Sequence, residues 1–528
     1  MQGVFYFTQL PYQSSYSMNS KWVSPVVLVI IMLTFLLAKW SSLSLPYFWD
    51  EAWSYILAIH TMANQSPCFL PGCIDTELYR GHPLFLYFLS ATWLKFISPS
   101  LFSMHLFAML ISIWAIVSFY RLCAYFLPAG WALFAAGFLV MQQAFFVQSS
   151  FVLPEILLML LTTEAAIGFL KNQTWKLILS LILLTLTKET GIIIGLGFFM
   201  ASLFIKKQAY RQIIWTYLIA FIPCLLFYLD QKIKLGWFFY PFHQDLVDFS
   251  YAAIKLKAGI IFHFLFIDQG RKILIPALSL LTIFYMWRKA KYHYVVLIVL
   301  GLLACASYFL ESAILCLVQL VIAGILFWEK RAHEHKLKQL AALGVSISIL
   351  VVAFSSINFL MLRYLLVLLP FLLLAIFILL HKVLKSKSIL IPATCFLYVI
   401  HGFMSFHFTF YKRGWHDDVS INYLNMVRVH QQVVSLAEEN NWQENNVYTH
   451  FLMKYYLTRK ETGYLGSNTP FAHVRHEGTL EPDDEIIIIS TIEQNDYLEN
   501  AIHDGSRHVL LKRFQIHHAW SEVYGIKE

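Results

Sequence analysis

Long apolar segments recur along most of this chain and limit the folds that it can adopt. A helix needs about 20 apolar residues to cross a bilayer, or somewhat fewer when neighbouring helices shield it. The candidate spans are 22–40, 101–122, 131–149, 154–170, 174–188, 189–206, 212–229, 272–288, 292–310, 311–328, 338–360, 362–381 and 387–405. Composition agrees, because 59% of the residues are hydrophobic and only 13% are charged, whereas about 25% are charged in a soluble domain. The sequence therefore predicts a mainly α, polytopic membrane protein with about 13 spans.

Basic residues gather in short clusters between the apolar segments, at 206–211, 288–291, 330–338 and 382–387. Such clusters mark cytoplasmic loops, so the net charge of +8 reflects orientation in the membrane and not nucleic-acid binding. The acidic loop 41–82 should face outward. Both placements hold only if 83–98 is a re-entrant or interfacial helix that does not cross. This topology predicts a cytoplasmic N-terminus, a first segment retained as a signal anchor, and an extracytoplasmic C-terminal region.

The composition changes near residue 411 to that of an ordinary soluble protein. Residues 426–439 have the periodicity of an amphipathic helix. Four consecutive isoleucines in 485–490 are typical of a buried strand, and 508–511 is predicted as another strand. We therefore predict a small extracytoplasmic α/β domain over 411–528. It follows a transmembrane domain over 1–410, whose outer loop 41–100 carries the active site.

Several ionisable residues are predicted to meet at the outer membrane face. They are Asp50, Glu51, Arg80, His82, Glu155, Lys188 and Arg363. Each alone has an ordinary explanation: Lys188 and Arg363 as interfacial anchors, Glu155 as an acid at a helix N-terminus, and His82 as a loop histidine. Snorkelling charges would be scattered over both faces, however, and these gather on one. Together they indicate a site for an anionic substrate, with a carboxylate as base and cations for a phosphate.

Five motifs occur in an order that resembles a known family. They are Asp50-Glu51, Gly81-His82-Pro83-Leu84, Leu153-Pro154-Glu155, Leu186-Thr187-Lys188, and Arg363-Tyr364-Leu365-Leu366 ending in Leu369-Pro370. They are similar to motifs of the GT-C glycosyltransferases of the protein O-mannosyltransferase and aminoarabinose (lipid A) transferase type, most closely over about 45–205. The resemblance implies a GT-C fold in the inner membrane. It also implies inverting transfer at the outer face, from a polyprenyl-phosphate sugar to a lipid, glycan or protein acceptor.

The resemblance also implies roles for individual residues. Asp50 matches the acid proposed as catalytic base, Glu51 is its neighbour in the motif, and Glu155 stands at the position of a second acid. His82 stands where the aminoarabinose transferases have lysine, so Arg80, Lys188 and Arg363 are alternatives for binding the donor phosphate. Of these, we predict Lys188 and Arg363 as the phosphate ligands and Glu155 as a supporting acid near the acceptor. The large soluble insert of the protein O-mannosyltransferases is absent from this sequence.

Two cysteines, Cys68 and Cys73, are predicted to lie outside. An oxidising exterior permits a disulfide between them, and the intervening Pro71-Gly72 turn could bring them together. His243 and His263, in an outer loop at about 230–271, leave a divalent cation open as a cofactor. Their spacing defines no ligand set, so we assign no metal ligand.

Two other classes of membrane protein stay open as alternatives. A secondary transporter or lipid-linked sugar flippase would place its ionisable residues near the bilayer midplane, often in two related halves. The chain has no such repeat, and its charged residues gather at one face. A sugar-polymer ligase or polymerase would share the lipid-linked donor. Glycosyl transfer is the function that the sequence favours.

Overall fold

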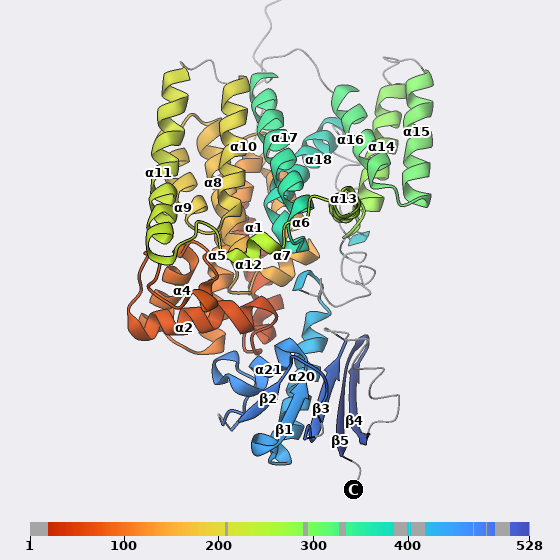
Figure 1. Cartoon of the computed structure of the whole chain (residues 1–528). Helices are drawn as coiled ribbons and strands as arrows, with labels where there is room; N and C mark the ends of the chain where they lie inside the picture. The colour runs from red at the N-terminus through yellow and green to blue at the C-terminus, as the bar shows by residue number, and fades with distance from the viewer. Residues whose placement is uncertain are drawn as a thin grey trace, which may run out of the picture.

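The computed structural model describes residues 20–205, 210–288, 294–326, 334–384, 399–400, 402, 418–467, 469–481, 483–491 and 507–526. They form a bundle of roughly parallel helices and a smaller domain with a β-sheet, called here the sheet domain (418–526). The sheet domain meets one end of the bundle (Figure 1).

The bundle consists of helices that run along a common direction. They are α1 (Ser20–Lys39), α5 (Leu101–Ala124), α6 (Ala129–Val140), α8 (Pro154–Leu170), α9 (Thr174–Thr185), α10 (Thr190–Ile205), α11 (Tyr210–Leu235), α14 (Arg271–Arg288), α15 (Tyr294–Phe309), α16 (Ala313–Leu326), α17 (Glu334–Ile357) and α18 (Leu369–Val383). Large apolar side chains such as Trp215 and Leu226 on α11 and Val295 on α15 are exposed on the outside of the bundle. An outward apolar surface of this kind faces lipid.

Five segments of the described chain are long and apolar enough to cross a membrane: Ser24–Ser42, Leu101–Ala124, Tyr210–Leu235, His335–Ile357 and Leu362–Val383. Shorter apolar helices lie beside them in the bundle. These are the properties of a multi-pass membrane protein. The prediction of about 13 spans is more specific than these five segments show, so it stays a prediction.

The span predicted over 131–149 is two helices, α6 and α7 (Gln143–Gln148). Gln142 separates them with an extended backbone, φ −69° and ψ 119°. Its side-chain carbonyl accepts a hydrogen bond from Arg271 at the start of α14. A buried polar side chain with a long-range partner fixes the break, which apolar periodicity alone does not show.

The span predicted over 362–381 also begins irregularly. It begins with a 3₁₀-helix, η3 (Leu362–Leu368). Helix α18 follows, with Pro370 in the first turn of α18. Proline fits there because the first turn has no hydrogen bond for its missing N–H to make. The last predicted span, 387–405, lies largely outside the described residues.

Other helices lie across the end of the bundle, on the side of the sheet domain (Figure 1). The outer loop forms a π-turn, η2 (Glu51–Tyr55), and then α2 (Ile56–Gln65), α3 (Thr76–Tyr79) and α4 (Phe85–Phe96). The last of these covers most of the stretch predicted not to cross, and it packs against α2 and α5. Whether 83–98 is re-entrant or interfacial stays a prediction.

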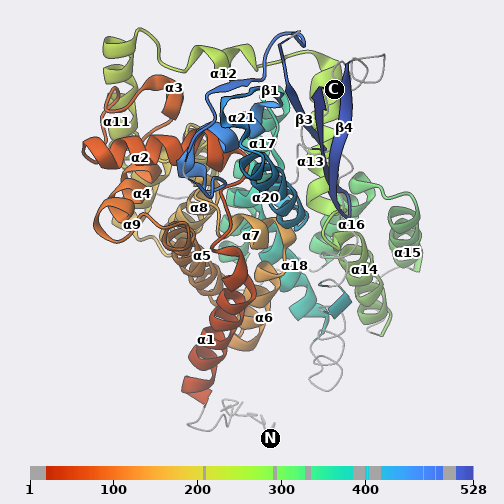
Figure 2. The same ribbon diagram turned by 90° about the horizontal axis from the view of Figure 1, so that it is seen from below.

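The stretch predicted as an outer loop, 230–271, is partly helical: it contains α12 (Pro241–Asp245) and α13 (Tyr251–Phe266). Figure 1 shows α13 end-on and Figure 2 shows it lengthwise, so it lies across the bundle axis. Its sequence is apolar but is interrupted by Lys255 and Lys257. A helix of this composition suits the edge of a bilayer better than its interior.

The sheet domain begins with α20 (Tyr423–Glu439), which packs against β4 and β5. Its other elements are β1 (Asn446–Thr449), α21 (Phe451–Thr458), β2 (His473–Arg475), β3 (Ile486–Ser490), β4 (His508–Ile516) and β5 (Ala519–Ile526). The strand order is β2-β1-β3-β5-β4. β1 is parallel to β2 and β3, whereas β5 is antiparallel to β3 and β4. Helix α20 and strands β3 and β4 lie where the sequence predicts a helix and two strands. The domain boundary at 410 falls among residues that the structure does not describe.

His430, on α20, is fully buried in the sheet domain, and neither ring nitrogen has a hydrogen-bond partner among the described residues. Burial, and then the nearby His450, lower the pKa of His430 well below 6.5. The unfolded chain therefore takes up a proton as pH falls below 6.5, while the folded chain does not. At pH 5 this difference costs about 2 kcal/mol of folding stability.

We expect His430→Leu to remove this loss. The unfolding temperature of wild type should fall further than that of the variant when purified protein is moved from pH 7.5 to pH 5. The matched control is His473→Leu, because His473 is exposed on β2. Equal pH dependence in wild type and His430→Leu would show that His430 is protonated in the folded protein.

Candidate active site

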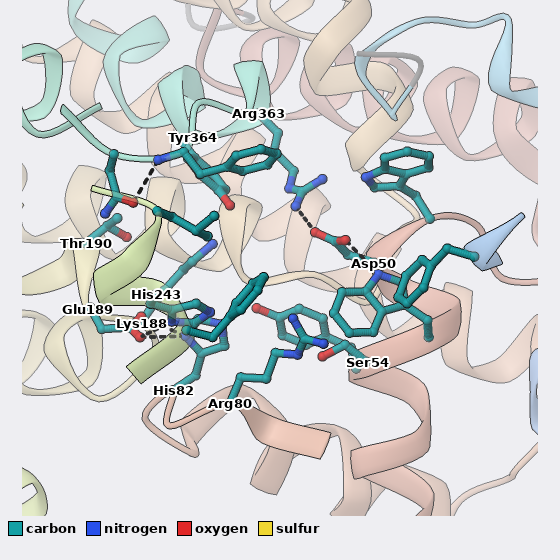
Figure 3. A pocket seen from close by; sticks show the side chains of 18 of the residues that line it. Asp50, Ser54, Arg80, His82, Lys188, Glu189, Thr190, His243, Arg363 and Tyr364 are labelled. Carbon is teal, nitrogen blue, oxygen red and sulfur yellow. Dashed lines mark hydrogen bonds and ion pairs between the residues drawn. The ribbon is translucent and has the colours of Figure 1, made fainter. Parts of the chain in front are cut away.

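A cavity of about 1240 Å³ lies between the end of the bundle and the sheet domain. Seven parts of the chain line it: the outer loop, the start of α10, the α12 region, the α17–η3 junction, the turn after β1, the residues after β2, and β3. Lining residues with ionisable side chains are Asp50, Tyr55, Arg80, His82, Lys188, Glu189, His243, Arg363, Tyr364, His450, His476 and Glu477. Residues predicted from distant motifs therefore share one cavity (Figure 3).

Arg363 is the centre of the ionic contacts in this cavity. Its side chain is 2% exposed and forms ion pairs with Asp50 and Asp418, and its Nε lies 3.4 Å from Glu155 Oε1. One guanidinium thus faces three carboxylates from separate parts of the chain. Buried charges are stable only when they are paired in this way.

Of the three carboxylates that Arg363 faces, Asp50 is the one that lines the cavity. The Nε1–H of Trp53 donates to Asp50 Oδ1 at 2.9 Å, and Oδ2 is paired with Arg363. Burial by itself would raise the pKa of Asp50, but Arg363 and Trp53 together hold it below its usual value. The carboxylate is therefore ionised at neutral pH. The preceding residue, Trp49, has a left-handed backbone (φ 55°), an uncommon conformation that turns the chain just before Asp50.

Lys188 and Glu155 form a buried pair beneath the cavity. Lys188 Nζ lies 2.9 Å from Glu155 Oε1 and 4.1 Å from the centre of the Tyr364 ring. Lys188 lines the cavity, but Glu155 does not. Glu155 is therefore a partner of Lys188 and Arg363 outside the cavity wall, and its predicted catalytic role stays a prediction.

Glu51 is also buried and lies outside the cavity wall. It is 1% exposed and accepts hydrogen bonds from the backbone N–H groups of Val152, at 2.7 Å, and Phe48, at 3.3 Å. His105 Nε2 is 3.3 Å from the same carboxylate. Glu51 does not line the cavity. Its contacts attach the outer loop to the segment before α8.

Sequence reasoning missed Asp418, which lies at the start of the sheet domain. It is 1% exposed; its Oδ2 is paired with Arg363 and its Oδ1 has no hydrogen-bond partner among the described residues. Burial raises the pKa of Asp418 to about 6, in spite of the nearby Arg363. The only sequence signal was a second acidic pair, Asp417-Asp418, at the boundary between the two domains.

Arg80 differs from the other cations of the cavity. Its guanidinium lies 3.7 Å from the centre of the Trp53 ring, and its backbone is left-handed (φ 52°). Among the described lysines and arginines that line the cavity, Lys188 and Arg363 are paired with carboxylates, whereas Arg80 has no ion pair with a described carboxylate. Arg80 is therefore the cation that is available to an anionic ligand.

Three side chains could hold a divalent cation. His82, Glu189 and His243 bring one possible ligand atom each to within 4.8 Å of one another. A hydrogen bond of 2.7 Å links His82 Nδ1 to Glu189 Oε1. Burial, and then His82, lower the pKa of His243 to about 4, so at neutral pH His243 is in the uncharged form that binds metal. His263 is not part of this group, because its Nδ1 lies 3.0 Å from Asp268 Oδ1 at the end of α13.

Cys68 and Cys73 are joined in a disulfide, with their Cα atoms 6.4 Å apart. The bond closes a small loop between α2 and α3. Neither cysteine lines the cavity.

Comparisons with known proteins give a structural likeness without a close sequence relative. No protein-family model matches the chain, and no curated protein does. Among solved structures, the fold is similar to that of ArnT from Cupriavidus metallidurans. The apo crystal structure is 13% identical and has a TM-score of 0.43, with 96% of this chain and 98% of that chain covered. The structure bound to undecaprenyl phosphate is 12% identical with a TM-score of 0.45, and 97% and 99% are covered. At this identity few residues are shared, so the activity has to be inferred from the cavity itself.

Proposed function

We propose that this protein is a GT-C type membrane glycosyltransferase that transfers a sugar from a polyprenyl-phosphate donor to an acceptor hydroxyl or amine at the outer face of the inner membrane. One observation carries the proposal. An ionised carboxylate, Asp50, and a cation with no ion pair to a described carboxylate, Arg80, line the same cavity at the end of the bundle that meets the sheet domain. The motif order described above supports the same reaction.

Asp50 is positioned to act as the general base. Its carboxylate takes the proton from the acceptor O–H or N–H as that atom attacks the anomeric carbon of the donor sugar. The bond from the anomeric carbon to the phosphate oxygen breaks, and the polyprenyl phosphate leaves with the electron pair. A single displacement of this kind inverts the anomeric centre. Arg363 and Trp53 hold Asp50 in place for the proton transfer.

Arg80 is the residue that we propose for the leaving phosphate. A guanidinium can bind two phosphate oxygens at once, which suits the charge that develops as the sugar–phosphate bond breaks. Lys188 and Arg363 are the phosphate ligands that the sequence predicts, but both are paired with carboxylates, so we propose Arg80 in their place.

The cavity wall nearest the bundle is apolar and suits the lipid part of the donor. It is lined by Ile192 and Ile193 of α10, Phe354 of α17, and Phe242 and Val247 of the α12 region. A small number of charged groups against an apolar wall is the usual composition of a ligand pocket. A transporter site would instead be expected near the middle of the helices.

The test is release of polyprenyl phosphate by purified protein in nanodiscs, supplied with a panel of undecaprenyl-phosphate sugars and acceptor extracts. We expect Arg80→Met to lower kcat/KM by about 10²–10³-fold, as for loss of one transition-state donor. Arg80→Lys should keep part of the activity, because it keeps the charge but not the bidentate geometry.

The matched control is Arg211→Met, because Arg211 is exposed at the start of α11 and does not line the cavity. Wild-type turnover by Arg80→Met would exclude the phosphate role of Arg80. Transport of the lipid-linked sugar without its cleavage would instead favour the flippase alternative.

A further inference from the structure

The parallel half of the sheet domain has a feature that the proposed chemistry does not use. β1 lies between β2 and β3 and is parallel to both. From β1 the chain passes to β2 on one side of β1, and the next strand, β3, then pairs with the other side of β1. In open α/β sheets, ligands bind outside the carboxyl ends of the strands where the strand order reverses in this way.

This edge of the sheet opens into the cavity that contains Asp50. Thr449 ends β1 and His450 follows it. Ile489 lies near the end of β3, and His476 and Glu477 follow β2. All five line the cavity. The ends of β1 and β3 are joined by a hydrogen bond of 3.0 Å between His450 Nε2 and Ser490 Oγ. We call this surface the strand-end crevice (Thr449, His450, His476, Glu477 and Ile489).

Aromatic rings connect the strand-end crevice to the base. The ring of Phe451, at the start of α21, lies 5.4 Å from that of His476 and 5.0 Å from that of Trp53. Trp53 donates the hydrogen bond to Asp50. In Figure 3, Asp50 lies between the His82–Glu189–His243 group and the pale blue ribbon of the sheet domain. A ligand in the crevice would therefore reach Asp50 from the side opposite that group.

The charges of the crevice differ from those of the wall formed by the bundle and outer loop. Glu477 is 87% exposed, and its nearest ionic neighbour is His476 Nε2, at 3.3 Å. Within the described part of the sheet domain, no lysine or arginine lines the cavity. The described lysines and arginines that do line it are Arg80 of the outer loop, Lys188 and Arg363. The Glu477 carboxylate repels a phosphate, and in the crevice it lies together with imidazole and aromatic rings. These groups suit the hydroxyl groups and apolar faces of a sugar.

We propose that the strand-end crevice is the acceptor site and that the acceptor is a neutral glycan, which presents a sugar hydroxyl to Asp50. The inference rests on the proposed glycosyl transfer and specifies its second substrate. Glu477 and His476 accept hydrogen bonds from the glycan, and Phe451 with Trp53 supports a sugar ring. The donor lipid and its phosphate occupy the apolar wall and Arg80.

The test uses the full-length protein in nanodiscs with two probes. The first is an array of neutral bacterial oligosaccharides, and the second is undecaprenyl phosphate, whose binding is measured by native mass spectrometry. Wild type should bind a subset of the glycans. Glu477→Gln and His476→Ala should each weaken that binding about tenfold, as expected for a hydrogen bond to a charged or imidazole group, and should leave undecaprenyl phosphate binding unchanged. Glu444→Gln is the matched control, because Glu444 is exposed in the same domain and does not line the cavity.

The outcomes separate the inference from the function on which it rests. Binding of undecaprenyl phosphate without glycan binding, or glycan binding that Glu477→Gln and His476→Ala do not alter, overturns the acceptor site and leaves the glycosyltransferase proposal standing. Loss of undecaprenyl phosphate binding in Glu477→Gln assigns the crevice to the donor and also overturns the inference. Failure of wild type to bind undecaprenyl phosphate overturns the proposed function itself.

Discussion

Replacing Asp50 by asparagine is expected to slow sugar transfer about 10²–10⁴-fold, the usual contribution of a positioned general base. Asparagine keeps the shape of the side chain and can still accept the hydrogen bond from Trp53, but it cannot take the acceptor proton. The donor should still bind, because the proposed phosphate ligand is Arg80. The loss should therefore appear in kcat, with little change in the KM for the donor.

Two further variants make the Asp50 result specific. Asp245→Asn makes the same change at an exposed position that does not line the cavity, and it should transfer sugar at the wild-type rate. Asp50→Glu keeps the carboxylate but moves it by one methylene, so it should retain a small fraction of activity. Transfer by Asp50→Asn at the wild-type rate would show that another group is the base.

The sequence placed the main site residues at one membrane face because depth and orientation follow from apolar length and charge. Asp50, Lys188 and Arg363 come from separate motifs and share the cavity. Their pairing was not predictable, since a sequence does not show which acid a given cation meets after packing. Glu155, for example, contacts Lys188 and lies outside the cavity wall.

The two acids that matter most to Arg363 illustrate the same limit. Asp50 precedes Arg363 by 313 residues, and Asp418 follows it by 55. Local patterns carry no information over such separations. Glu51 is adjacent to Asp50 in the sequence but buried among backbone N–H groups, because the π-turn that begins at Glu51 directs the two side chains to different surroundings.

Helices and strands with a strong residue pattern could be predicted from the sequence, whereas the shortest strands could not. α20 and β3 follow from an amphipathic pattern and a run of isoleucines. β1 and β2 have only four and three residues, too few for an alternating pattern to be distinguished from a loop. They are nevertheless strands that carry the crevice, so the proposed acceptor site could not be predicted from sequence.

Arg363→Gln is expected to have the second large effect, on stability as well as on activity. The substitution would leave Asp50, Glu155 and Asp418 close together without the cation that they share. Removing one partner of a buried ion pair costs about 3–5 kcal/mol, because the remaining charges stay buried. The unfolding temperature in detergent should fall clearly, and transfer should be lost because Asp50 is no longer held.

The matched control for Arg363→Gln is Arg121→Gln. Arg121 is 47% exposed and pairs with Glu164 at 3.3 Å. A partly exposed pair of this kind is worth about 0–1 kcal/mol, so the same substitution there should scarcely change the unfolding temperature. Equal effects of the two substitutions would contradict the central role of Arg363.

Adding Asp418→Asn to Arg363→Gln should restore part of the lost stability. The pKa of Asp418 is raised to about 6 by burial, so ionising it costs folding stability as pH rises from about 4 to 6. Neutral asparagine removes that cost and one of the repelling charges. We expect recovery of about 1–2 kcal/mol, the coupling seen between residues in direct contact. Activity should not return, because Asp50 still lacks its cation. If the double variant is as unstable as the sum of the single variants, Asp418 and Arg363 are not coupled, and the link between the sheet domain and Asp50 is not ionic.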